Sequence, residues 1–194
     1  MSRPDAIRIS GLTKRYGDLA AVDGVDLAVA PGELFSLLGP NGAGKTTTIK
    51  MLCCLVRPTA GSAEVLGHDI SADPTAVKQV IAVSPQETAI AEHLTARENL
   101  RLMARLHGLG KDETEARSEE LLEMTGLTAR AGDRVRKYSG GMKRRLSIAM
   151  ALVSNPDILF LDEPTLGLDP QSRRGLWDYI EGLKGGMTIV LTTH

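Results

Sequence analysis

The sequence predicts an α/β fold with a mostly parallel central sheet, an N-terminal antiparallel β subdomain and an inserted α-helical subdomain. Three observations support this prediction. Four short segments are apolar nearly throughout, which is typical of parallel strands covered by helices on both faces. Two segments near the N-terminus alternate apolar and polar side chains, as half-exposed strands do. A later stretch spaces its apolar residues three and four apart, which indicates amphipathic helices.

The strands follow from these patterns in order along the chain. The alternating segments are residues 6–10 and 25–29, and they predict a peripheral antiparallel sheet. The apolar strands of the central sheet are expected at residues 34–38, 80–83, 158–161 and 188–193.

Four helices are predicted. The first follows residue 44 and should turn Ile49, Leu52, Cys53 and Val56 toward the sheet. Thr95 with Glu98 three residues later predicts a capping box before Leu100, Met103 and Ala104. Asp112 with Glu115 repeats that pattern before Leu121, Leu122 and Met124. Ser139 is a suitable N-cap for the last helix, whose buried stripe is expected to contain Met142, Leu146, Ala149 and Val153.

Length and composition exclude several classes of protein. With 194 residues, 42% hydrophobic and 24% charged, the chain is predicted to be one globular domain, 1–194. We expect a core of about residues 1–90 and 155–194 and a helical subdomain of about residues 91–154. The net charge of -1 gives no reason to expect a nucleic-acid partner. The start of the chain lacks an apolar signal core, and no segment approaches the roughly 18 apolar residues of a membrane span. The two cysteines are adjacent, so we expect a reducing, cytosolic location.

A glycine-rich segment matches the phosphate-binding pattern GxxxxGK[ST] between a predicted strand and a predicted helix. Glycines let the backbone turn its N–H groups toward an anion, and the helix N-terminus adds partial positive charge. The lysine would neutralise phosphates, the first threonine would bind Mg²⁺, and the second would donate to a phosphate. This pattern does not distinguish a kinase, a GTPase or an ATP-driven machine. Its residues are Gly39, Pro40, Asn41, Gly42, Ala43, Gly44, Lys45, Thr46 and Thr47.

Two acids follow the apolar strand at residues 158–161. A buried strand rarely ends in paired carboxylates without a cation or a reaction to serve. We expect Asp162 to hold Mg²⁺, and Glu163 to orient a water molecule for attack on the terminal phosphate. Together with the glycine-rich segment, the pair favours hydrolysis over transfer to a second substrate.

A third motif stands about 20 residues before the acids. Residues 138–143 read YSGGMK, and paired glycines at a helix start expose N–H groups as an anion site. Together with the basic side chains that follow, this suggests that a negatively charged group docks there. For the side chains themselves, Lys143, Arg144 and Arg145, we favour the alternative of a solvated basic face.

With these motifs in this order, nearly the whole chain resembles an ABC-type ATP-binding domain with a RecA-like P-loop core. Residues 139–141 match the centre of the family signature LSGGQ, with Tyr138 in place of Leu and Met142 in place of Gln. This variant is similar to the one in bacterial drug- and antibiotic-resistance exporters of the daunorubicin-resistance kind. Met142 cannot donate the hydrogen bond that a Gln would, whereas Ser139, Gly140 and Gly141 keep theirs.

The resemblance implies roles for four further residues. Tyr16 matches the aromatic residue that stacks on adenine, and Gln86 matches the Q-loop residue that contacts Mg²⁺ and the attacking water. Asp169 matches the D-loop that crosses to a partner subunit, although Asp169 would also serve as a cap for the helix at Pro170. His194 matches the switch histidine near the terminal phosphate.

The resemblance also implies partners and a mechanism. ATP on one subunit's residues 39–47 would be covered by residues 139–142 of a second copy or a homologous subunit, in a head-to-tail dimer. A separate transmembrane permease would contact the region of residues 86–98, and the assembly would be peripheral to the cytoplasmic face of the membrane. A non-transport ABC ATPase acting as a regulatory, ribosome-associated or DNA-associated factor is the alternative, and a P-loop kinase is disfavoured. Because domains of this family continue beyond the position of His194, we expect this chain to be C-terminally truncated and weakly active or inactive in hydrolysis.

Overall fold

The computed structural model describes residues 4–87 and 89–193, and these form two compact units. The first unit is built from Met1–Val83, Asp157–Glu163 and Leu183–His194. The second unit is built from Ser84–Pro156 and Pro164–Gly182. The chain therefore leaves the first unit and returns to it twice, so that residues far apart in sequence share one core.

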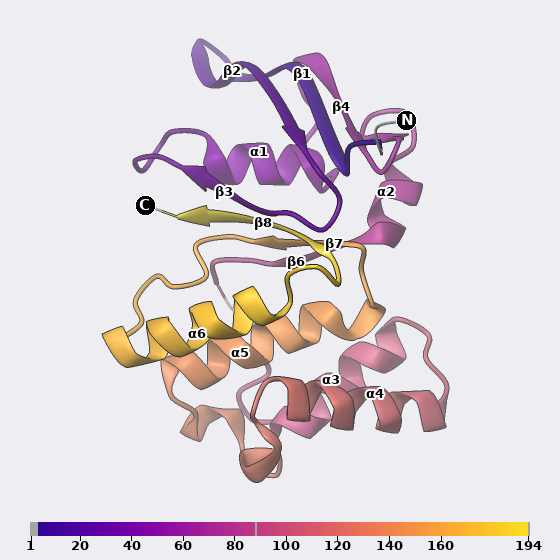
Figure 1. Ribbon diagram of the computed structural model, residues 1–194, viewed down its shortest axis with the longest axis vertical. Helices are drawn as coiled ribbons and strands as arrows, with labels where there is room; N and C mark the ends of the chain where they lie inside the picture. Colours follow the sequence, from indigo (N-terminus) through magenta and orange to yellow (C-terminus); the bar gives the residue numbers. More distant parts are fainter. Residues whose placement is uncertain (1–3, 88, 194) are drawn as a thin grey trace. The chain divides into compact units, whose positions relative to one another are not determined.

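An antiparallel sheet of four strands lies in the first unit, as the alternating segments predict (Figure 1). Ile7 and Ile9 are buried while Arg8 and Ser10 are exposed, so only one face of the sheet packs on the core. Ile7 pairs with Val29 at one end of the longest ladder. In pairing order the strands are β2 (Leu19–Val29), β1 (Ile7–Tyr16), β4 (Ala60–Val65) and β5 (His68–Asp69).

The central sheet of the first unit has the order β3-β8-β7-β6, and β8 pairs in parallel with both β3 and β7. The strands are β3 (Leu34–Leu38), β8 (Thr188–Thr193), β7 (Ile158–Leu161) and β6 (Ile81–Ser84). All four predicted strands are present, and β6 begins one residue later than expected. The prediction that residues 34–38 are covered on both faces is wrong. β3 is the outer strand of the described sheet, so Leu38 is 72% exposed.

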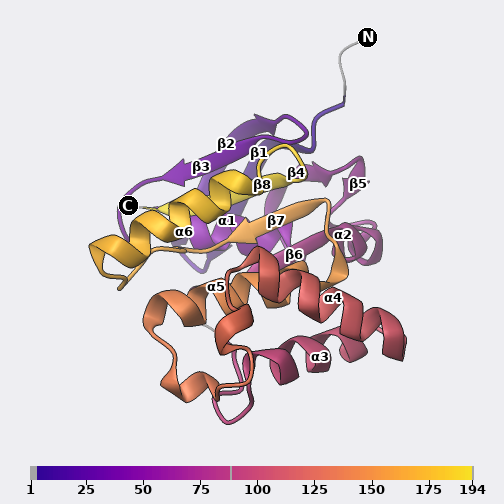
Figure 2. The same ribbon diagram turned by 60° about the horizontal axis from the view of Figure 1, so that its bottom comes forward.

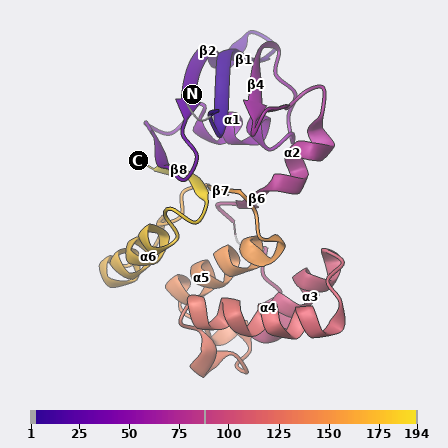
Figure 3. The same ribbon diagram turned by 45° about the vertical axis from the view of Figure 1, so that its right-hand side comes forward.

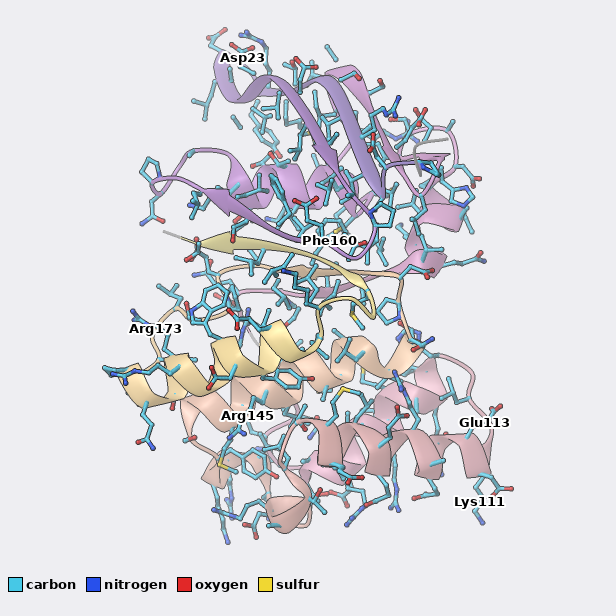
Figure 4. All side chains as sticks on the ribbon, viewed as in Figure 1. Asp23, Lys111, Glu113, Arg145, Phe160 and Arg173 are labelled. Carbon is cyan, nitrogen blue, oxygen red and sulfur yellow. The ribbon has the colours of Figure 1, made fainter. Side chains whose placement is uncertain are left out.

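Helix α1 (Lys45–Leu52) lies between the two sheets of the first unit (Figures 1 and 3). Ile49, Leu52 and Cys53 are buried as predicted, and burial raises the pKa of the Cys53 thiol. They share one hydrophobic core with residues of both sheets, including Phe160, which is fully buried (Figure 4). Val56 lies beyond the end of α1 but is packed against the same core, as expected. A second helix, α2 (Pro74–Val80), leads into β6.

The second unit consists of four helices and short 3-10 turns (Figure 2). Helix α3 packs against α4, and α5 packs against α6. The helices are α3 (Ala96–Leu106), α4 (Lys111–Met124), α5 (Gly140–Ala151) and α6 (Pro170–Gly182); the turns are η1 (Thr128–Arg130), η2 (Val135–Lys137) and η3 (Leu152–Ser154). Across residues 4–87 and 89–193, none of the helices combines the length and the apolar character needed to cross a bilayer.

Helix capping agrees with the sequence in two places and differs in one. The capping box of Thr95 and Glu98 begins α3, and the Ser139 hydroxyl caps α5, as predicted. The predicted box of Asp112 and Glu115 is wrong. Helix α4 already begins at Lys111, and the Glu113 carboxylate accepts a hydrogen bond from the Gly110 amide at 3.0 Å.

Several predicted helix positions also differ, and Met103 and Met142 are half-buried rather than buried. Met124 is 41% exposed because α4 ends there. Val153 is buried, as expected, but it lies in the 3-10 turn η3 rather than in α5.

Candidate functional site

The glycine-rich segment, residues 39–47, connects β3 to α1 and forms a tight backbone loop. Gly44 precedes the helix with a φ of 84°, in the left-handed region that favours glycine. A Cβ at this position would lie 2.2 Å from the Ala21 carbonyl oxygen, so only glycine fits. The first turn of α1 therefore begins directly behind the loop, and its amides have no acceptor within the helix. Such a loop is suited to bind an anion.

Within this loop, the Lys45 side chain is buried and folds back onto the backbone. Its ammonium group donates to the carbonyl oxygens of Gly39 at 2.6 Å and of Pro40 at 3.2 Å. The Glu163 Oε1 atom lies 3.5 Å from the same Nζ, and both side chains are only 9% exposed. A cation held at the mouth of an N–H-rich loop is an arrangement that attracts a polyphosphate.

The next residue of α1, Thr46, also contacts an acid. Thr46 Oγ1 donates to the Asp162 carboxylate, with distances of 3.1 Å and 3.0 Å to its two oxygens. Asp162 is 6% exposed and follows the fully buried strand β7. The fold thus brings Lys45 and Thr46, at the start of α1, together with Asp162 and Glu163, more than 110 residues later in the chain.

A residue that the sequence analysis did not select, Thr192 of β8, connects the two acids. Its hydroxyl donates to Asp162 Oδ1 at 2.6 Å and accepts a hydrogen bond from the Glu163 amide at 2.8 Å. Thr192 is completely buried. The available signal was a polar residue at the carboxyl end of an apolar parallel strand, which is where α/β sheets bind their ligands.

Glu163 has a φ of 46°, a conformation that is uncommon for a residue other than glycine. The hydrogen bond from its amide to Thr192 helps to hold this backbone conformation. The side chain is thereby kept next to Lys45, at the end of β7, instead of continuing along the strand.

Thr46 and Asp162 also fit a magnesium ion chemically. Mg²⁺ prefers oxygen ligands and is usually bound by one or two carboxylate or hydroxyl groups together with substrate phosphates and water. In the described part of the chain no cluster of three or more His, Cys, Asp or Glu side chains forms a closed metal cage. A hydroxyl and a carboxylate are oxygen donors of the kind that can share Mg²⁺ with a bound nucleotide.

The remaining predicted residues of the first unit lie at the end of β1, in α1 and in the glycine-rich loop. Tyr16 ends β1, is 51% exposed, and has the Lys14 Nζ atom 4.9 Å from the centre of its ring. Its open ring face is suited to stacking. Thr47 is half-buried in α1, and residues 40–43 are exposed. The predicted residue His194 lies outside the described residues.

Gln86, the signature segment (residues 138–142) and Asp169 belong to the second unit. Gln86 follows β6 and is exposed. Ser139 Oγ accepts a hydrogen bond from the Met142 amide at 3.3 Å, which caps α5 behind the paired glycines. Tyr138, which replaces the usual Leu, is buried, and its hydroxyl donates to the Arg130 carbonyl at 2.6 Å.

Asp169 caps α6, as the sequence allowed. Its Oδ1 atom accepts from the amides of Gln171 and Ser172, each at 3.0 Å. Hydrogen bonds from the Ser172 hydroxyl and from these amides hold the pKa of Asp169 below its usual value.

The interpretation of Lys143, Arg144 and Arg145 as a solvated basic face is wrong for Arg144, whereas Lys143 and Arg145 are half-buried. Arg144 is only 4% exposed, and its guanidinium donates to the carbonyl oxygens of Pro85 and Gln86. Lys143 pairs with Glu92, and Arg145 donates to the Thr125 carbonyl at 3.1 Å; its position on α5 is labelled in Figure 4. Basic charge alone did not reveal these acceptors, because each is a backbone or side-chain oxygen distant in sequence.

The chain matches the family described as ABC transporter over residues 22–166. It is 50% identical over 188 residues to the daunorubicin resistance ATP-binding protein DrrA3 of Streptomyces coeruleorubidus, covering 97% of this chain and 60% of that protein. It is 43% identical over 189 residues to the linearmycin resistance ATP-binding protein LnrL of Bacillus subtilis, covering 97% and 61% respectively. The chain thus spans about three fifths of the length of these curated relatives.

Two solved structures are also similar. The ATP-binding cassette MJ0796, in a dimeric post-hydrolysis state bound to ADP and Pi, has a TM-score of 0.83 at 28% identity, covering 97% of this chain and 88% of that one. The Clostridium perfringens protein cbiO1, part of the ABC transporter complex cbiONQ, has a TM-score of 0.91 at 26% identity, covering 99% and 79%.

Proposed function

Because the chain belongs to the ABC transporter family, by a match that covers residues 22–166, we propose that it binds ATP with Mg²⁺ and hydrolyses the ATP to power a membrane exporter. One observation carries the proposal: Lys45, Thr46, Asp162 and Glu163 form a single cluster directly behind the glycine-rich loop, with Lys45, Asp162 and Glu163 buried. The resistance functions in the names of the relatives support export of a drug, an antibiotic or a lipid-like compound.

In this proposal each group has a separate task. The amides of residues 39–47 bind the phosphates, Lys45 offsets their negative charge, and Tyr16 stacks on the adenine. Mg²⁺, held by Thr46, Asp162 and Gln86, would supply charge neutralisation at the terminal phosphates. Glu163 accepts a hydrogen bond from the attacking water and polarises it.

The proposal extends to the assembly. Ser139, Gly140, Gly141 and Met142 would cover the nucleotide bound by a second copy or a homologous subunit, and Asp169 would contribute to that contact. His194 would act near the terminal phosphate as the switch histidine. The cap on α5 leaves the hydroxyl proton of Ser139 able to donate, because Ser139 Oγ is the acceptor in the cap. The permease would be a separate transmembrane protein, which would bring this subunit to the cytoplasmic face of the membrane.

Glu163→Gln tests the central step. The amide keeps the size of the side chain and an oxygen facing Lys45, but it is a far weaker base. We expect the dissociation constant for ATP with Mg²⁺ to stay within about threefold and phosphate release to fall by about a hundredfold or more. An ATP-bound dimer should then accumulate, detectable by size-exclusion chromatography.

Glu64→Gln is the matched control, since it makes the same chemical change at an exposed position of β4. It should leave binding and phosphate release unchanged. Undiminished phosphate release in Glu163→Gln would remove Glu163 from its role, and the absence of binding heat from folded parent protein would reject the proposal as a whole.

A further inference from the structure

A buried arginine of α5 holds the backbone of the segment that contains Gln86. Arg144 Nη1 donates to the Pro85 carbonyl at 2.5 Å and contacts the Gln86 carbonyl at 3.4 Å. A guanidinium that is only 4% exposed requires acceptors, and hydrogen bonds from a charged donor are about twice as strong as neutral ones. The main chain at Gln86 is therefore attached to α5 even though the Gln86 side chain itself is exposed.

One turn further along α5, a second contact holds the same segment. Ser147 Oγ lies 3.0 Å from Ser84 Oγ, and both side chains are buried. Arg144 and Ser147 are three residues apart, so they lie on the same face of the helix. Three consecutive residues, 84–86, are thus attached to that face at two points.

The far end of the segment is also fixed. Asn99 of α3 is buried and makes two hydrogen bonds with Ala91, accepting from its amide at 3.0 Å and donating to its carbonyl at 3.1 Å. The Glu92 carboxylate pairs with Lys143, the residue directly before Arg144. The Glu92 backbone carbonyl accepts a hydrogen bond from the Arg136 amide at 3.0 Å. The first turn of α5 therefore contacts the segment at both of its ends.

This turn is continuous with the signature segment, because Arg144 follows Met142 by two residues. We propose that Arg144 is a positioning residue for Gln86: it joins the Gln86 backbone to the signature helix, so that the two motifs move as one body. The inference rests on the proposed function, which gives Gln86 its contact with Mg²⁺ and water. It adds that closure of a partner subunit on residues 139–142 is transmitted to Gln86 through the Arg144 guanidinium.

The planar fork of Arg144 is essential to this role, since it presents several donors in a fixed geometry. Arg144→Gln removes the charge and most donors, and Arg144→Lys keeps the charge with one compact donor group. Arg117→Gln is the matched control. Arg117 also donates to a backbone carbonyl of the second unit, that of Leu152 at 2.6 Å, so the control removes an equivalent bond at another place in that unit.

The test combines deuterium uptake of peptides covering residues 84–94 with the dissociation constant and kcat for ATP in each variant. Arg144→Gln should raise uptake in these peptides and lower kcat by about tenfold to a hundredfold, with binding within about threefold of the parent. Arg144→Lys should recover part of the loss of kcat. Arg117→Gln should change neither the uptake of these peptides nor kcat by more than about twofold.

Unchanged uptake in Arg144→Gln would overturn the inference, and so would a kcat equal to that of Arg117→Gln. A merely structural role would lower stability and binding without the selective loss of kcat or its recovery by lysine. If the parent protein bound no ATP, the proposed function would fail, and the uptake comparison alone would decide whether Arg144 holds the segment.

Discussion

Thr192→Val removes one hydroxyl group from the buried end of β8 while keeping the shape of the side chain. Two hydrogen bonds disappear with it, one donated to Asp162 Oδ1 at 2.6 Å and one accepted from the Glu163 amide at 2.8 Å. The surrounding groups have no access to water at this position, because Thr192 is completely buried.

The magnitude follows from those two bonds. A hydrogen bond to a charged group contributes about 1.5–3 kcal/mol, and a buried amide left without an acceptor costs about 1–3 kcal/mol. We therefore expect Thr192→Val to lower the free energy of unfolding by about 3–5 kcal/mol. Thr192→Ser keeps the hydroxyl and loses one methyl group, which costs about 1 kcal/mol.

Urea unfolding followed by circular dichroism measures both free energies, and phosphate release measures the consequence for catalysis. Because the Glu163 amide would lose the partner that helps to hold its positive φ, phosphate release should fall in Thr192→Val and persist in Thr192→Ser. Equal free energies of unfolding for the two variants, or a loss of less than about 1 kcal/mol in Thr192→Val, would refute this reasoning.

Three further predictions come from the same structure. Gly44→Ala should lower the free energy of unfolding by about 1–3 kcal/mol more than Gly42→Ala and should abolish the ATP binding that calorimetry detects. The two glycines have similar φ values, 84° and 83°, but only a Cβ at Gly44 would clash with a carbonyl oxygen of β2. Equal losses in the two variants would contradict this. Gly141→Ala should push α5 away from α6 and lower the melting temperature, because a Cβ at residue 141 would lie 2.8 Å from Ser172 Oγ. Adding Ser172→Gly should restore part of that loss. Hydrogen bonds keep the pKa of Asp169 lower in the folded state than in the unfolded state. Their stabilisation of α6 is therefore fully present above the unfolded-state pKa of about 4, and it is lost as the pH falls through the folded-state pKa. Urea unfolding at a series of pH values should show this loss in the parent protein and a smaller one in Asp169→Asn.

Most strands and helices could be predicted from the sequence because their patterns are local. The strands β3, β7 and β8 have the bounds that the apolar pattern of the sequence predicts. The predictions were wrong where a neighbouring strand or side chain determines the exposure of a residue or the start of a helix. Leu38 is exposed because β3 has only one neighbouring strand in the described sheet, and α4 starts early because Glu113 reaches the Gly110 amide.

The candidate site divides in the same way. Lys45, Thr46, Asp162 and Glu163 were selected from motif spacing, and the structure brings them together. Thr192 was not selected, because a threonine near the end of a strand has no distinctive local pattern.

Residues 39–47 by themselves indicate a loop suited to bind phosphate, since glycine spacing and the start of a helix act through adjacent peptide groups. The partners of Thr192 and Arg144 were decided only by tertiary structure. A hydrogen bond requires its donor and acceptor to lie about 3 Å apart. Thr192 reaches Asp162, and Arg144 reaches Pro85, only after strands and helices that are distant in sequence have packed together.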